Sequence, residues 1–187
     1  TRQAKMEVSR AIASRDNLRV RAWMKLQADA RERRNRRRAL LEGIHLVATY
    51  FDRVGQPREL ILSQSAIASR EVAALARRAS RAPVIVSDRV FAAIADTETP
   101  VGVAAEIDLP DASADLSNSS HSVVIEGVQD AGNLGAIIRS AAAFGVDSVV
   151  VGSGSADPWS PKVLRAAMGG HFFLQVAQTT DLAQALS

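Results

Sequence analysis

The stretch that decides the fold runs from Val123 to Gly152, VVIEGVQDAGNLGAIIRSAAAFGVDSVVVG. It opens with a continuous apolar run, Val123 to Ile125, which predicts a strand buried on both faces. Apolar residues then recur at helical spacing and predict one core-facing stripe: Leu134, Ile137, Ile138, Ala141 and Ala142. Gly145 is placed to end that helix in a left-handed conformation, and Asp147 to Val151 predicts the next strand.

The same alternation continues downstream. A helix is predicted over Lys162 to Met168, with Ser160 as its N-cap. A third strand is predicted over His171 to Val176, and Asp181 is expected to cap a helix that the chain does not finish.

Upstream, helix-like spacing from Lys5 to Ala30 is interrupted before Asn17, which is a plausible N-cap for a helix from Leu18 onward. Strands and helices are then expected in alternation. The strands are Ala39–Glu42, Glu59–Leu62, Val84–Val86 and Val101–Ala105, and the helices are Ile44–Val54, Ala66–Ser80 and Asp88–Ala95. Strands separated by helices of this length predict parallel pairing, with helices packed on the faces of the sheet.

Between Asp108 and His121 the composition changes to DLPDASADLSNSSH, which contains few residues able to bury apolar area. This change predicts a linker over 108–121 that separates an N-terminal domain, 1–107, from a second domain, 122–187. The alternative is a long surface loop within a single domain.

Composition excludes several classes of site. The chain has no cysteine, so disulfides, thiolate metal sites and cysteine nucleophiles are ruled out. Its 3 histidines are widely spaced, which disfavours a structural zinc site, and no metal is expected. No apolar run is long enough to span a bilayer, and an unexported, cytoplasmic protein without a membrane partner is the default expectation.

Charge is distributed unevenly along the chain. Residues 1–47 carry 13 Lys or Arg against 5 Asp or Glu, and six of these arginines are clustered: Arg31, Arg33, Arg34, Arg36, Arg37 and Arg38. A cluster of this density attracts polyanions and neutralises phosphates, which favours a nucleic acid as the partner. The alternative is a solvated helical face with no binding role.

The turn after the first strand of the opening stretch carries the candidate catalytic residues, Asn133 and Arg139. It lacks both the G-x-G-x-x-G fingerprint and a Walker lysine. Asn133 occupies a position expected for an N-cap, and Arg139 lies off the core stripe, about 140° around the helix from Leu134. The carboxyl edge of a parallel sheet is the usual place for a ligand. Alternatively, Asn133 merely caps the helix and Arg139 pairs with Glu126 or Asp130.

The segment QDAGNLGAIIRSAAAFGVDSVVV resembles the first signature motif of the SpoU/TrmH family of RNA ribose methyltransferases, within the SPOUT superfamily. The following SADPWSPKVLRAAMGGHFFLQV is similar to the next stretch of that family. Upstream, RRRALLEGIHLV and ADTETPVGVAAE resemble the accessory substrate-binding domain that many members carry. The sequence departs from the family pattern at Ala131, Val101 and Ala167, none of which is Asn133 or Arg139.

The resemblance implies an α/β fold in which an N-terminal α/β/α RNA-binding domain precedes the first part of a SPOUT parallel-sheet domain. The family's remaining motifs, which form its trefoil knot and most of its S-adenosylmethionine pocket, are expected C-terminal to Ser187. The chain alone is therefore expected to bind the cofactor poorly and to be catalytically incomplete. A homodimer is implied on the same ground.

The implied reaction is methyl transfer from S-adenosylmethionine to a ribose 2′-hydroxyl of structured RNA, with rRNA favoured over tRNA. Arg139 matches the family's catalytic arginine, and Asn133 would orient Arg139 or the ribose. The expected RNA contacts are Arg33, Arg34, Arg36, Arg37, Arg38, Lys162 and Arg165. Two alternatives stay open: a non-catalytic RNA-binding protein that retains the scaffold, and, less favoured, an ordinary doubly wound nucleotide-binding domain.

Overall fold

The structure is a computed structural model that describes residues 11–110, the N-terminal part, and residues 119–182, the C-terminal part. The N-terminal part is built on four strands, β1 (Arg38–Glu42), β2 (Glu59–Ser63), β3 (Val84–Val86) and β4 (Val103–Asp108). Their order in the sheet is β1-β4-β2-β3, with β2 and β3 parallel and β4 antiparallel to both of its neighbours.

The prediction of parallel pairing is therefore wrong for β4. This strand enters the sheet beside the carboxyl ends of its neighbours, where the Ser63 amide donates to the Gly102 carbonyl and the Gly43 amide donates to the Val103 carbonyl. A parallel strand would have to enter from the opposite edge. Alternating periodicities specify which segments are helices and strands, but they do not specify the edge at which the chain enters the sheet.

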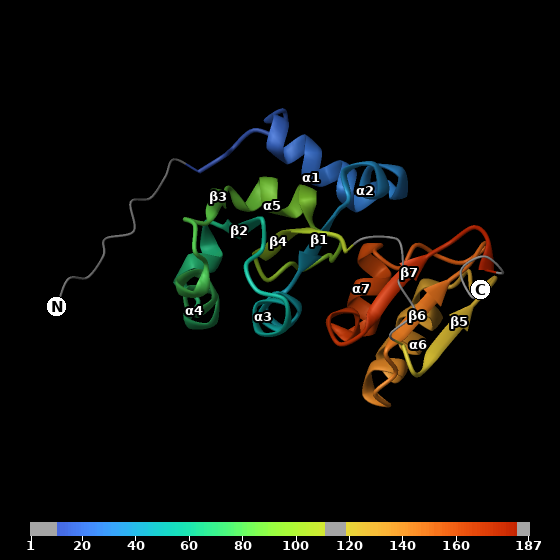
Figure 1. The fold of residues 1–187 in the computed structure, drawn as a ribbon. Helices are drawn as coiled ribbons and strands as arrows, with labels where there is room; N and C mark the ends of the chain where they lie inside the picture. Colours follow the sequence, from blue (N-terminus) through green and yellow to red (C-terminus); the bar gives the residue numbers. More distant parts are fainter. Residues whose placement is uncertain (1–10, 111–118, 183–187) are drawn as a thin grey trace.

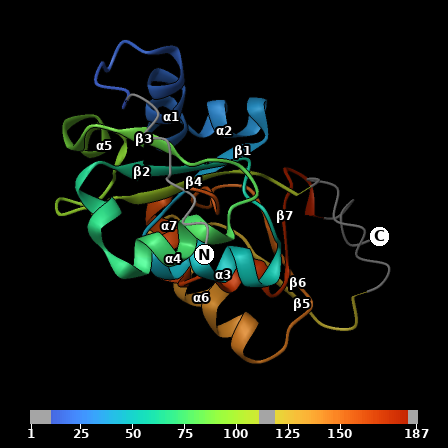
Figure 2. The same ribbon diagram turned by 90° about the vertical axis from the view of Figure 1, so that its left-hand side faces the viewer.

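Helices cover both faces of this sheet (Figures 1 and 2). On one face lie α1 (Leu18–Ala28), α2 (Ala30–Arg36) and α5 (Asp88–Ile94); on the other lie α3 (Ile44–Arg53) and α4 (Arg70–Arg78). Side chains of a strand alternate between the two faces. Leu40 accordingly packs with Trp23 and Phe91 on the first face, whereas Leu41 packs with Val47 and Leu75 on the second.

Local signals account for most of these helix ends. The Asn17 side chain accepts from the Arg19 amide and caps α1, as predicted, and the Ser87 side chain caps α5 through the Val90 amide. The single helix predicted over Ala66–Ser80 is instead a 3-10 turn, η1 (Ser65–Ala68), followed by α4. Ser69 separates them, because it is extended and caps α4 through the Val72 amide.

The start of the chain also differs from the prediction. Residues 11–14 are not helical, and Ile12 forms an isolated bridge with Val86 beside β3. The segment 5–10 of the predicted helix lies outside the described residues, as does 111–118 of the predicted linker.

The C-terminal part contains a parallel sheet of β5 (Ser122–Ile125), β6 (Ser148–Val151) and β7 (Gln175–Gln178), in that order. It also contains α6 (Ala131–Ala143), α7 (Pro161–Ala167) and a 3-10 turn, η3 (Gly170–Phe172). The central strand β6 is buried at all four residues. β5 lies at an edge and leaves Val124 43% exposed, so the prediction of burial on both faces is wrong for this strand.

The predicted strand from His171 begins four residues late, because His171 lies inside η3 rather than in β7. The helix predicted over Lys162–Met168 is α7, with Met168 as its left-handed C-cap. As predicted, Gly145 has a positive φ of 72° just after α6.

The two parts of the chain share one hydrophobic core. Trp159, Leu164 and Val176 of the C-terminal part belong to the same buried cluster as Tyr50 and Ile107 of the N-terminal part. The packing places α7 and η3 against the face of the first sheet that α3 and α4 also cover (Figure 1). None of the described helices has the length and apolarity needed to cross a bilayer.

Candidate active site

Helix α6 starts directly after β5, and Asp130 is its N-cap. The Asp130 Oδ1 accepts a hydrogen bond from the Asn133 backbone amide at 2.7 Å. The prediction that Asn133 occupies the N-cap is therefore wrong, because the capping carboxylate lies three residues earlier and the helix already begins at Ala131. Asn133 lies in the first turn of α6 and is exposed, so its side chain is not used in capping.

Arg139 lies further along α6 and is exposed, as its position off the core stripe predicts. Its Nη1 lies 3.6 Å from the Met168 Sδ, which is a weak acceptor. Among the described residues it makes no ion pair, so the alternative in which it pairs with Glu126 or Asp130 is not observed. The guanidinium charge is thus left available at the surface.

The side chains of Asn133 and Arg139 are not hydrogen-bonded to each other in this structure. Six residues of α-helix separate them by about 9 Å along the axis and by about 120° around it. The structure gives no hydrogen bond between their side chains. Asn133 therefore does not orient Arg139 directly within this chain.

Two glycines fix the position of α6 instead. A Cβ on Gly135 would lie 2.5 Å from the Ala166 Cβ and 2.8 Å from the Val163 carbonyl oxygen, so α7 contacts α6 at a point where no side chain fits. A Cβ on Gly170 would lie 3.1 Å from the Cα of Arg139. The backbone that carries Arg139 is therefore held between α7 and η3.

The two basic residues of α7 differ in availability. Lys162 is exposed, and within the described ranges it makes no ion pair. The Arg165 Nη1 lies 2.6 Å from the Asp96 Oδ2, so this side chain joins α7 to the N-terminal part. Half of the Arg165 side chain stays exposed, which leaves part of its guanidinium open to an anion.

The arginine cluster of α2 divides in the same way. Arg33 is buried: its Nε lies 2.7 Å from the Asp157 Oδ2, and its Nη1 donates to the carbonyls of Leu26 and Gln27 at 2.5 and 3.1 Å. The Arg33 guanidinium is enclosed, and three of its five N–H groups are engaged, so Arg33 does not present its charge at the surface for the RNA contact expected of it. It joins the carboxyl end of α1 to the loop before α7.

The remaining members of the cluster lie nearer the surface. Arg36 pairs with Glu32 at 2.7 Å, and Arg38 pairs with Glu106 at 3.0 Å on the sheet. Arg31, Arg34 and Arg37 are exposed. Arg34 and Arg37 line a surface cavity together with residues of the C-terminal part.

These two arginines line a cavity of about 570 Å³ at the carboxyl ends of β6 and β7. Its other wall is the loop Gly152 to Ser155, with Thr179 and Thr180. The carboxyl edge of a parallel sheet is where such folds bind ligands, and here two guanidinium groups from the N-terminal part face it. Sequence reasoning missed this site, because nothing local links α2 to a loop more than 100 residues away.

Comparisons with known proteins match both parts of the chain. The model of the SpoU rRNA Methylase family matches residues 120–187, and the model of the MRM3-like substrate binding domain matches residues 17–105. Residues 120–187 are thus similar to the SpoU rRNA Methylase family. We call residues 120–187 the SpoU region and residues 17–105 the MRM3-like region.

Two relatives match the chain to different extents. The chain is 34% identical over 167 residues to the 23S rRNA (guanosine(2553)-2′-O)-methyltransferase RlmP of Bacillus subtilis, a match that covers 89% of the chain and 64% of RlmP. It is 45% identical over 93 residues to the mitochondrial rRNA methyltransferase 3A of Danio rerio, covering 46% of the chain and 21% of that protein. The chain therefore spans less than two thirds of the length of these relatives.

The fold is that of solved SpoU structures. The SpoU methyltransferase AviRb from Streptomyces viridochromogenes, solved in complex with the cofactor AdoMet, matches with a TM-score of 0.83 and 22% identity over 91% of the chain and 66% of AviRb. This agreement confirms the predicted α/β fold with a parallel-sheet second region.

The charged side chains of the cavity of Arg34 and Arg37 are two guanidinium groups, with no carboxylate among its described lining residues. The cavity therefore suits an anionic group such as a phosphate or a carboxylate.

Proposed function

We propose that the protein of which this chain is part is an RNA methyltransferase that transfers a methyl group from AdoMet to a ribose 2′-hydroxyl of rRNA. The observation that carries the proposal is Arg139, an exposed arginine without a carboxylate partner on a helix of the SpoU region whose backbone is clamped on two sides. The related RlmP and the rRNA methyltransferases act on rRNA by their names, which supports rRNA as the substrate.

Arg139 would stabilise the charge that develops on the attacking ribose oxygen. A guanidinium is protonated at any physiological pH, so it cannot serve as the base that removes the hydroxyl proton. A fixed positive charge aimed at a developing alkoxide lowers the barrier without reorganisation of solvent. Since α7 and η3 hold the backbone at Arg139, the charge is carried on a rigid support.

Asn133 would contact the RNA and not Arg139. Its amide is exposed at the first turn of α6, close to the carboxyl end of β5, and can both donate to and accept from a ribose or phosphate. Sequence-independent contacts to the RNA backbone would come from the exposed basic residues of the predicted set, which are Arg34, Arg36, Arg37, Lys162 and Arg165.

AdoMet would supply the methyl group. From the family resemblance we also infer a division into domains at 1–107 and 122–187, a trefoil knot formed with further motifs, a homodimer and a cytoplasmic location. The separate matches of two family models, at 17–105 and 120–187, support this division.

The test is a map of 2′-O-methylation on total RNA from cells with the intact gene, with the gene deleted, and with Arg139→Ala. One rRNA position should lose its methyl group in both altered strains. Lys162→Ala is the matched control from the same region, and it should weaken RNA binding while leaving methylation detectable. A complete methylation map in the deletion strain would refute the proposal, and full methylation with Arg139→Ala would remove Arg139 from the mechanism.

A further inference from the structure

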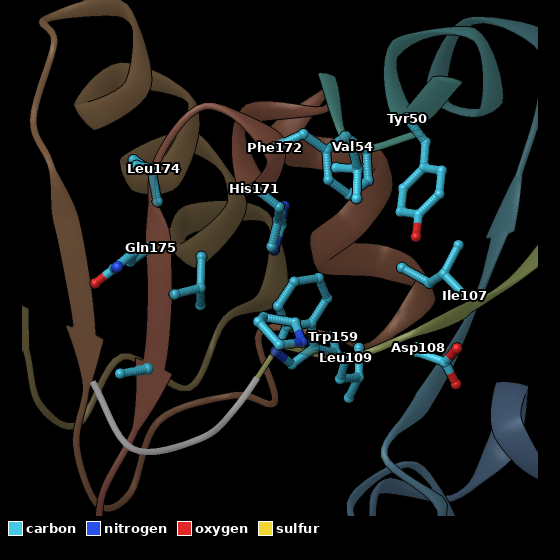
Figure 3. Close-up of a pocket in the computed structure, with 13 residues that line it drawn as sticks. Tyr50, Val54, Ile107, Asp108, Leu109, Trp159, His171, Phe172, Leu174 and Gln175 are labelled. Atoms are coloured by element: carbon cyan, nitrogen blue, oxygen red, sulfur yellow. The ribbon is translucent and has the colours of Figure 1, made fainter. Parts of the chain in front are cut away.

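A second cavity, of about 590 Å³, lies between the N-terminal and C-terminal parts (Figure 3). Four of its lining residues are aromatic rings: Tyr50 from α3, Trp159 from the loop before α7, and His171 and Phe172 from η3. Figure 3 shows the Tyr50 hydroxyl directed toward Ile107, across the cavity from Trp159 and His171. The cavity is therefore an aromatic chamber to which both parts of the chain contribute.

Three polar atoms on the rings of this chamber have no hydrogen-bond partner within the described residues. The His171 Nδ1 is buried and unpaired. The Tyr50 hydroxyl and the Trp159 Nε1 also make no hydrogen bond, but these two atoms are not fully enclosed and can reach a group in the cavity. A buried polar atom normally has a partner, so the unpaired Nδ1 beside two available donors points to a ligand with polar edges.

The protonation state of His171 defines what that partner must offer. Burial lowers the pKa of His171 to about 4, against the weaker opposing effects of the Pro158 carbonyl and the Asp157 carboxylate, so the ring is neutral at pH 7. Its Nε2 lies 2.7 Å from the Pro158 carbonyl oxygen, which can only accept, so Nε2 carries the proton. Nδ1 is therefore an acceptor, and it requires an N–H or O–H group on the ligand.

The other two rings present donors. Burial and the nearby Asp108 raise the pKa of Tyr50, which keeps its hydroxyl protonated, and the indole Nε1 of Trp159 can only donate. An acceptor and two donors at the rim of an apolar, ring-lined chamber match a flat heterocycle with both kinds of group on its edge. Nucleobases have this pattern together with a π-face for stacking on aromatic side chains.

The aromatic chamber adjoins the cavity of Arg34 and Arg37. Both are lined by Leu109, Pro110, Trp159 and Val176. Arg34 is exposed and makes no ion pair in the described part of the chain. A ligand that places a ring in the chamber can therefore extend toward a positively charged site, which suits the phosphate attached to the base.

We propose that this composite groove binds one unpaired nucleotide of the RNA, with its base in the aromatic chamber and its phosphate at Arg34 and Arg37. The proposal rests on the proposed function, since it takes RNA as the partner. In this proposal the base is recognised where the two parts of the chain meet, by a set of residues that neither part supplies alone.

The test is a fluorescence titration of the chain with the four nucleosides and their 5′-monophosphates. The chain has 2 tryptophans, and Trp23 is buried on the opposite face of the first sheet with its indole hydrogen-bonded to Glu106, so quenching reports Trp159. At least one monophosphate should quench. Tyr50→Phe, which keeps the ring and removes the hydroxyl, should weaken that binding about three- to tenfold.

Arg34→Ala should weaken the monophosphate about tenfold and leave the matching nucleoside unchanged, because only the phosphate reaches Arg34. Arg31→Ala is the matched control: it removes an exposed arginine of the same helix that does not line either cavity, and it should change neither ligand. Ultraviolet crosslinking to a single-stranded oligonucleotide, with the linked peptide identified by mass spectrometry, should mark the peptide of Trp159.

Binding of an rRNA fragment, measured in parallel by filter retention, separates this proposal from the proposed function. If the chain retains the rRNA fragment but no nucleotide quenches Trp159, the base-recognition groove is refuted and RNA binding stands. Quenching that is equal in the wild type, Tyr50→Phe and Arg34→Ala would refute it as well.

Discussion

Helices α2 and α6 both carry arginines that the sequence marks as functional, and the structure uses them in opposite ways. In α2, Arg33 is enclosed at 4% exposure with Asp157 as its counter-charge, and Arg36 is paired with Glu32. In α6, Arg139 is exposed, and its guanidinium has the sulfur of Met168 as its hydrogen-bond contact within the described residues. The denser cluster thus includes charges that are less available than that of Arg139.

The contrast teaches that charge density along a sequence does not measure charge available to a ligand. The enclosed guanidinium of Arg33 gives three of its five N–H groups to a carboxylate and two carbonyls, so it is not presented at the surface to a phosphate. Its contribution is to hold two parts of the fold together. An arginine without a counter-charge contributes little to stability and is free to act on a substrate. Each prediction below tests one side of this contrast.

The largest effect is expected from Asp157→Ala. This change leaves the Arg33 guanidinium buried without its counter-charge, and breaking a buried pair in this way costs about 3–5 kcal/mol of unfolding free energy. Urea unfolding monitored by circular dichroism measures the loss. Asp96→Ala is the control, because it breaks the other ion pair between the two parts, which is half exposed on the arginine side, and should cost less than about 1 kcal/mol.

A double variant sharpens this test. If the cost of Asp157→Ala comes from the uncompensated charge, then Arg33→Met combined with Asp157→Leu should recover most of the lost stability. A double variant as unstable as the single one would mean that the hydrogen bonds of Arg33 to Leu26 and Gln27, and not the charge, hold the two parts together.

The next largest effect is the dependence of stability on pH that is due to His171. The Asp157 carboxylate lies close enough to influence the pKa of His171. Burial lowers the pKa of His171 to about 4 in the folded chain, from the ordinary 6.5. The unfolded chain therefore takes up the proton first as the pH falls. The stability due to the neutral ring is complete above pH 6.5 and is lost progressively down to pH 4, by about 3 kcal/mol in total.

Urea unfolding at several pH values checks this expectation. His171→Gln keeps a donor for the Pro158 carbonyl but does not titrate, so the difference between wild type and variant isolates the histidine from the carboxylates that titrate below pH 5. Parallel pH profiles for the two proteins would contradict the assignment of a neutral, buried ring.

An intermediate loss of stability is expected from Gly135→Ala. This change alters the packing of α6, the helix that carries Arg139, and leaves the charge of Arg139 in place. The added methyl group would lie 2.5 Å from the Ala166 Cβ, and overpacking of this kind costs about 1–3 kcal/mol. Gly132→Ala in the first turn of the same helix is the control, since its Cβ would approach only the side chain of Asp130. It should leave thermal stability unchanged or slightly raised, because alanine favours a helix. Equal losses in both variants would show that glycine is needed for backbone conformation and not for the contact with α7.

Local patterns in the sequence predict most of the elements of this fold. Asn17 and Ser87 cap the helices they precede, and the apolar stripe of α6 points to the core, because capping and helical periodicity depend on neighbours within one or two turns. The errors occur where a distant segment decides. β4 is antiparallel because it enters from the other edge, and β5 is half-exposed because it lies at the end of its sheet.

The residues of the candidate site were likewise predictable where their surroundings are local, and unpredictable where a distant segment decides. Arg139 was predictable, since an arginine off the apolar stripe of a helix is exposed unless a carboxylate lies near, and none does in the described residues. The fate of Arg33 was not predictable, because its partner Asp157 is 124 residues away. The groove of Arg34 and the aromatic chamber were missed for the same reason: each is formed by segments from both parts of the chain.

The smallest effect on stability is expected from Arg139→Ala. A small effect would indicate that Arg139 serves the function of the protein and not its fold. The side chain makes one weak contact with the Met168 sulfur, so its removal should change the unfolding free energy by less than about 0.5 kcal/mol. Arg36→Ala, which removes an exposed pair with Glu32, should cost about as little. The two variants then separate by function: only Arg139→Ala should abolish methylation of the target rRNA. A loss of more than about 2 kcal/mol on removing Arg139 would place it with Arg33, as an arginine that holds the fold, and the contrast between α2 and α6 would disappear.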